Sequence, residues 1–91
     1  MKVYTVYDAI SESFSPPMIN RTRGEAIRSF TDEVNNPQSR LNAHAKDYTL
    51  FEIADWDETT ATIEPFQAPF PVITALEAKQ VEEKPLTEKA A

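Results

Sequence analysis

The chain of 91 residues contains no cysteine and one glycine, Gly24, and it has no long apolar run. Without cysteine it can form neither disulfides nor thiolate metal sites, which suits a reducing compartment. One glycine cannot build a glycine-rich phosphate loop. A membrane-spanning helix needs about 20 apolar residues, and the N-terminus lacks a signal-peptide pattern. We therefore expect an intracellular protein that does not enter a membrane.

Residues that could carry out catalysis are also scarce. His44 is the single histidine, so no second histidine can complete a zinc site, and the sequence places no nucleophile beside it. Asp55, Asp57 and Glu58 form an acidic turn, but this turn lacks the spaced ligands and the glycine of a calcium loop. We predict that the chain is not an enzyme and that it holds no metal and no cofactor.

Charge is unevenly distributed along the chain. Residues 1–46 carry six Lys or Arg and five Asp or Glu, a balance of +1, and residues 47–91 carry three and ten, a balance of −7, which sum to the net charge of −6. Cationic side chains provide most of the contacts to a nucleic-acid backbone. Any contact with nucleic acid must therefore use the first half of the chain.

Hydrophobic periodicity predicts three strands and one main helix. Residues 2–8 are β-branched and aromatic, with Tyr4 and Val6 on one face and Val3, Thr5 and Tyr7 on the other. Residues 22–25 form a capping box, and apolar residues at helical spacing follow as far as the stop at residues 35–37. Residues 48–56 and 60–64 predict a hairpin that ends at Pro65. Serine and proline in residues 11–20 indicate a loop.

These elements predict an α+β fold, a small β-α-β-β domain over residues 1–68. Its three-stranded antiparallel sheet would carry one main helix on one face, leaving the other face for a second copy or a partner. Residues 69–91 would form a Pro-rich acidic tail with a short helix over residues 75–84 and be otherwise flexible. We expect residues 71–91 to be dispensable for folding.

Aromatic and basic residues in the first half suggest a surface for single-stranded nucleic acid. Bases stack on exposed aromatic rings, and arginines pair with phosphates. The other interpretation is that the aromatics fill the core and the arginines are solvated. The start of the predicted helix, near Arg21 and Arg23, could attract an anion through free amides or be an ordinary capped helix. The candidate contacts are Tyr4 and Tyr48 for stacking, and Arg21, Arg23, Arg28 and Arg40 for phosphate.

The order and spacing of several segments resemble a known family. These segments are residues 2–8, 26–35 and 47–53 and the acidic turn at residues 55–57. Together they resemble the small nonstructural protein of gokushovirus-type microviruses, which are single-stranded-DNA bacteriophages. The resemblance spans about residues 1–64. Members often carry a glycine in the hairpin turn, where this chain has Glu58-Thr59-Thr60, and the Pro-rich segment differs.

The resemblance implies a nonstructural protein, made in the cytoplasm of the infected bacterial host, that assists or regulates single-stranded DNA synthesis. One hypothesis is that it binds single-stranded DNA. The alternative is an adaptor without enzymatic activity, whose acidic half and exposed sheet face bind a phage or host replication protein. A homo-oligomer would also cover that face. A strong salt dependence of DNA affinity would separate the first hypothesis from the second.

Overall fold

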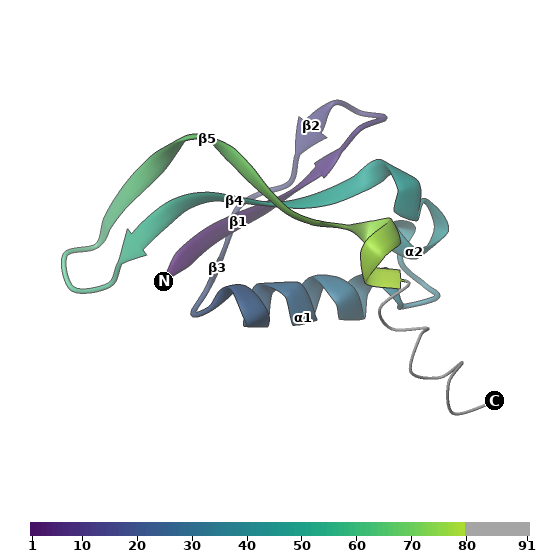
Figure 1. Cartoon of the computed structure of the whole chain (residues 1–91), viewed down its shortest axis with the longest axis horizontal. Helices are drawn as coiled ribbons and strands as arrows, with labels where there is room; N and C mark the ends of the chain where they lie inside the picture. The colour runs from purple at the N-terminus through teal and green to yellow at the C-terminus, as the bar shows by residue number, and fades with distance from the viewer. Residues whose placement is uncertain (80–91) are drawn as a thin grey trace.

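The computed structural model describes residues 1–79, which form one antiparallel sheet with helices packed against it. Figure 1 shows α1 lying across one face of a curled sheet, with the helical residues 75–79 beside its far end. The elements in chain order are β1 (Lys2–Asp8), β2 (Ser13–Phe14), β3 (Met18–Asn20), α1 (Arg23–Val34), α2 (Arg40–Ala43), the 3₁₀ turn η1 (Ala45–Asp47), β4 (Tyr48–Asp57) and β5 (Thr62–Thr74).

The predicted combination of a sheet and a helix is confirmed, but the three-stranded β-α-β-β arrangement is wrong. The sheet has five strands in the order β2-β1-β4-β5, and β3 also pairs with β1. The segment over residues 11–20, predicted to be a loop, contains β2 and β3, which both run antiparallel to β1. This segment therefore forms one edge of the sheet.

Ser15 explains how a serine- and proline-rich segment pairs with β1. Pro16 and Pro17 have no amide hydrogen to donate. Between β2 and β3, the Ser15 amide donates to the Val6 carbonyl at 2.8 Å, and the Val6 amide donates to the Ser15 hydroxyl at 3.0 Å. The Thr5 hydroxyl adds a bond to the Ser15 carbonyl at 2.7 Å. One side chain therefore bridges the gap that the two prolines leave in the ladder.

The other edge of the sheet is β5, which does not end at Pro65 as predicted. It runs through Pro65, Pro69 and Pro71 to Thr74, because an edge strand needs hydrogen bonds on one side only. The pairing with β4 has two register shifts, and at both of them the extra residues lie on β5. The domain boundary predicted between residues 68 and 69 falls inside β5. Residues 80–91, which include the second half of the predicted helix over residues 75–84, lie outside the described residues.

The main helix forms where its sequence predicts. The Thr22 hydroxyl accepts the Glu25 amide at 3.1 Å, and the Glu25 carboxylate accepts the Arg21 amide at 3.2 Å, so the capping box reaches one residue further back than expected. Phe30 and Val34 are buried on the predicted apolar stripe. This stripe holds α1 against the sheet.

The core extends beyond the predicted domain. Tyr4, Leu50 and Val34 are its largest fully buried side chains. Ala75 and Ala78 are 0% exposed and belong to the same cluster. Their helix starts with a second capping box, in which the Thr74 hydroxyl accepts the Glu77 amide at 3.1 Å. Residues expected to be dispensable therefore contribute to the core.

We predict that a chain ended after Pro69 loses its cooperative thermal transition. Such a truncation removes the Phe70–Thr74 part of the β4–β5 ladder and the buried Ala75 and Ala78, and the free energy of unfolding of a small domain is low. Circular dichroism melting is the measurement, with a chain ended after Lys79 as the control. An unchanged melt for the shorter chain would contradict this assignment of the core.

The β4–β5 turn generates a second prediction. Ala61 has a φ of 59°, a left-handed conformation that costs an L-residue about 1–2 kcal/mol and costs glycine little. We expect Ala61→Gly to raise the free energy of unfolding by about 0.5–1 kcal/mol in urea titrations. The neighbouring Thr60→Gly, at a residue without positive φ, should give no gain. Equal effects of the two substitutions would contradict the turn geometry.

Candidate interaction surface

The two tyrosines predicted to stack on bases lie in the core. Tyr4 is 0% exposed and Tyr48 is 9% exposed, and both pack in the cluster around Phe30 and Leu50. Alternation along β1 and β4 turns them toward α1. A buried ring offers no face to a base, so the stacking role predicted for Tyr4 and Tyr48 is wrong for this structure, and the alternative interpretation as core residues is correct.

The four predicted phosphate partners are exposed but do not form one surface. Arg21 precedes α1, Arg23 begins it and Arg28 lies on its exposed side. Arg40 begins α2, beyond the other end of α1. A 12-residue helix is about 18 Å long, which separates Arg40 from the first pair. The structure therefore sets Arg40 apart from the arginines at the start of α1.

Arg40 lies instead near a carboxylate on β1. The pKa of Asp8 is held below its usual value chiefly by the Ile10 amide, which donates to it, and to a smaller degree by the charge of Arg40. Arg40, Asp8, His44, Asp47 and Tyr48 line one shallow hollow. This end of the molecule mixes both charge signs, which is a poor match for a phosphate chain.

A buried carboxylate, which the sequence analysis missed, engages the two cations at the other end of the sheet. Glu52 on β4 is 3% exposed. Its carboxylate accepts a hydrogen bond from Arg23 Nε at 3.0 Å, and Lys2 Nζ lies 3.9 Å away while also pairing with Asp55. The alternation of residues along the strand could have indicated that Glu52 is buried, because Glu52 lies on the same face of β4 as Tyr48 and Leu50.

The same two cations also contact aromatic rings. Arg23 lies over Phe70 with 5.4 Å from its guanidinium carbon to the ring centroid, and Lys2 lies over Phe66 at 5.6 Å. The hydrogen bond and charge of Glu52 raise the pKa of Arg23. Arg23 and Lys2 are thus already paired within the domain, so a phosphate would have to compete with Glu52 for them.

The start of α1 is likewise occupied by its own side chains. Thr22 and Glu25 accept the amides of Glu25 and Arg21, as described above. The Glu25 carboxylate also places a negative charge where an incoming anion would bind. The interpretation as an ordinary capped helix therefore agrees with the geometry better than an anion site does.

The face of the sheet opposite α1 carries three aromatic rings in mutual contact, which we call the aromatic patch: Tyr7, Phe14 and Phe51. Their centroids lie 4.7 Å apart for Tyr7 and Phe14, 5.6 Å for Phe14 and Phe51, and 6.3 Å for Tyr7 and Phe51. Phe14 is 48% exposed, and Ile19, which pairs with Val3 further along β1, is 47% exposed. Exposed aromatic groups of this kind are characteristic of interaction surfaces.

The aromatic patch has no cation around it in the strands. Residues 3–20 and 47–78 contain neither lysine nor arginine, so Lys2 is the one cation in the five strands. Protein–nucleic-acid interfaces are strongly positive, whereas the centre of a protein–protein interface is rich in aromatic and poor in charged residues. The composition of this face matches the second class.

The remaining candidates from the sequence do not assemble into a site within residues 1–79. His44 is exposed, and this part of the chain holds no group of three or more histidine, cysteine, aspartate or glutamate side chains placed to share a metal ion. That the chain is not an enzyme stays a prediction. Over the same residues, no helix is long and apolar enough to cross a membrane.

Comparison with known proteins gives one match. The model of a protein family described as Phage ORF5 protein matches residues 1–78. No curated protein and no solved structure matches the chain.

The Tyr4 hydroxyl generates a prediction for stability. It is buried close to Glu52 and Arg23, which both act on its pKa, but no hydrogen bond of normal geometry reaches it within the described residues. Burial, and then the charge of Glu52, raise the pKa of Tyr4. Its contribution to stability is therefore present below the ordinary tyrosine pKa of about 10 and is lost as the pH rises through the higher value of the folded state.

We expect Tyr4→Phe to keep or raise the stability at neutral pH, by up to about 1 kcal/mol, because it removes an unpaired buried hydroxyl. It should also weaken the loss of stability above about pH 10. Urea titrations at neutral and alkaline pH test both effects, with Tyr7→Phe on the opposite face of β1 as the control. A loss of more than about 1 kcal/mol at neutral pH would show that the hydroxyl is hydrogen-bonded.

Proposed function

Because the chain belongs to the Phage ORF5 protein family, we propose that it is a nonstructural bacteriophage protein that assists or regulates single-stranded DNA synthesis in the host cytoplasm. We propose further that it does so as an adaptor without enzymatic activity, by binding a phage or host replication protein. The family match supports the origin from a phage. The aromatic patch supports the choice of a protein as the partner.

The observation that carries this choice is the aromatic patch, in which Phe14 is exposed and Tyr7 and Phe51 are partly exposed, on a sheet whose strands hold one cation. Aromatic side chains at the centre of an interface contribute a large share of binding energy once they are desolvated. An acidic protein with a net charge of −6 repels a phosphate backbone at long range. The aromatic side chains and the negative net charge both favour a protein partner over DNA.

A test of this function is capture from infected cells with the purified protein as bait, with and without nuclease. We expect a phage or host replication protein to remain bound after nuclease treatment and to be lost with Phe14→Ser, which removes an exposed ring of the aromatic patch. The control is Ile63→Thr, another exposed apolar residue, which pairs with Trp56 near the β4–β5 turn. Capture that disappears with nuclease would contradict the adaptor proposal.

A second candidate function is direct contact with single-stranded DNA, and one observation favours it. Arg21 and Arg28 are exposed, and neither forms a salt bridge with another residue in the described part of the chain. Fluorescence anisotropy with a labelled oligonucleotide at low and moderate salt separates the candidates. The adaptor proposal predicts no binding with the protein in micromolar excess. Binding whose salt slope falls by about 1.4 in Arg21→Gln/Arg28→Gln would favour DNA.

A further inference from the structure

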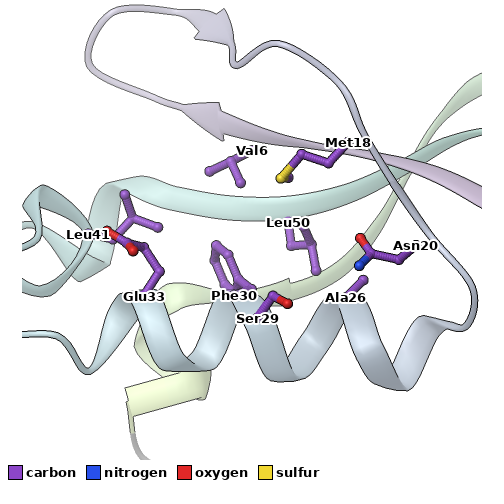
Figure 2. Close-up of a pocket in the computed structure, with 9 residues that line it drawn as sticks. All are labelled: Val6, Met18, Asn20, Ala26, Ser29, Phe30, Glu33, Leu41 and Leu50. Carbon is purple, nitrogen blue, oxygen red and sulfur yellow. The ribbon is translucent and has the colours of Figure 1, made fainter.

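The two flanks of α1 differ in what covers them. On the flank toward β5, Ala75 and Ala78 of the C-terminal helical turn pack in the core with Val34, and Lys79 Nζ donates to the Asn42 carbonyl at 3.1 Å. On the flank toward β1 and β3, a cavity of about 230 Å³ remains. Figure 2 shows it between α1 and the sheet edge, lined by Val6, Met18, Asn20, Ala26, Ser29, Phe30, Glu33, Leu41 and Leu50.

Burial around α1 confirms this asymmetry. Successive residues of a helix are rotated by about 100°, so Ser29 and Glu33 lie on one side of the central Ala26–Phe30 line, and Thr31 lies on the other. Thr31 is buried, whereas Ser29 and Glu33 are exposed. The described chain therefore covers the flank of Thr31 more completely than the flank of Ser29 and Glu33, where β3 contacts α1 but leaves the cavity open.

The open flank is an apolar groove with a defined floor and wall. Leu50 and Phe30 form the floor together with Val6, and Met18, 42% exposed, stands at the wall. A second hollow of about 350 Å³ shares Val6, Met18, Glu33 and Leu41 and extends it along the sheet edge. We call this combined feature the α1 groove. Each hollow is near or below the lower end of small-molecule pockets, about 300 Å³, which suits individual side chains of a polypeptide.

The charges of the α1 groove are all negative. Glu33 lines both hollows and Asp8 lines the second, and no lysine or arginine lines either. Neither carboxylate is in a salt bridge with a described residue, although Arg40 lies near Asp8, as described above. Charge complementarity therefore selects an occupant with lysine or arginine beside its apolar side chains.

The backbone of the sheet edge argues against binding by addition of a strand. Addition of a strand needs a row of unpaired amides and carbonyls, but the β2–β3 edge is short and is interrupted by Pro16 and Pro17. An occupant must bind through side chains instead. The opposite flank of α1 shows that a helical segment fits against this helix.

We propose that the α1 groove binds an amphipathic helical segment of a partner protein, whose apolar side chains enter between Met18 and Phe30 and whose lysine or arginine pairs with Glu33. Phe14 lies at the sheet edge, where it belongs to the aromatic patch and also lines the second hollow. The floor of the α1 groove, at Phe30 and Leu50, lies on the other face of the sheet from Tyr7 and Phe51, so this site does not depend on the function proposed above. With both occupied, the protein would join two partners.

The test uses three alanine-based helical peptides and heteronuclear NMR of the full chain. The first carries leucines at positions i and i+4 with flanking lysines, the second replaces the lysines by glutamates, and the third replaces the leucines by serines. We expect the first peptide alone to shift the methyl signals of Met18, Val6 and Leu41. We expect Glu33→Lys to lower the affinity for the first peptide by about fivefold or more. We expect Ser29→Trp, which places a bulky ring at the α1 groove, to abolish the binding of that peptide.

The matched control is Glu64→Lys, which makes the same charge change at an exposed residue of β5 away from the α1 groove and should leave the affinity unchanged. The proposal is overturned if the leucine–lysine peptide causes no methyl shifts at millimolar concentration. It is also overturned if the lysine and glutamate peptides bind equally, or if the shifts cluster on the aromatic signals of Tyr7 and Phe51, which line neither hollow of the α1 groove. The last result would assign peptide binding to the aromatic patch instead.

Discussion

The buried carboxylate of Glu52 constrains the rest of this structure. A charge removed from water costs several kcal/mol unless cations and hydrogen bonds compensate it. Arg23 and Lys2 provide that compensation from the first turn of α1 and the first residue of β1. Because both partners are fixed by the same carboxylate, the N-terminal end of α1 is held over β4. The apolar stripe of Phe30 and Val34 then fixes the remainder of the helix.

This position of α1 determines which surfaces the domain offers. One helix cannot cover a five-stranded sheet, and the C-terminal helical turn fills one of its flanks, which leaves the α1 groove on the other. Meanwhile the pairing of Arg23 and Lys2 with Glu52 removes the two cations that lie nearest the sheet. The opposite face carries the aromatic patch, and the strands contain no lysine or arginine besides Lys2. Both surfaces therefore favour proteins as partners, one through aromatic contact and one through apolar contact combined with negative charge.

The parts of the fold that depend on local chemistry were predictable from the sequence. The capping box at Thr22, the stripe at Phe30 and Val34, and β1 all form where the residues indicate. The prolines led to a wrong end for β5, because proline is excluded from the interior of a sheet but is tolerated in an edge strand. Local sequence does not show which strands are at an edge. Ser15 in particular replaces a ladder bond through its side chain, which composition cannot indicate.

The candidate site was less predictable, since period-2 alternation separates the faces of a strand without saying which one is buried. Tyr4 and Tyr7 were correctly placed on opposite faces of β1, yet the stacking role went to Tyr4, which is buried, and not to Tyr7, which belongs to the aromatic patch. Glu52 was passed over because a carboxylate at an inward position is rare. Its two partners are distant in sequence, so their pairing becomes visible in the folded chain alone.

The central claim, that Glu52 holds α1 through Arg23, is tested most directly by making Glu52→Gln in the original chain and in Arg23→Met, and comparing urea midpoints. If the claim is right, Glu52→Gln lowers the midpoint in the original chain. In the Arg23→Met chain, where the carboxylate has lost its closest cation, the same change leaves the midpoint unchanged or raises it. An equal loss in both backgrounds would show that the two residues are not coupled and would contradict the account.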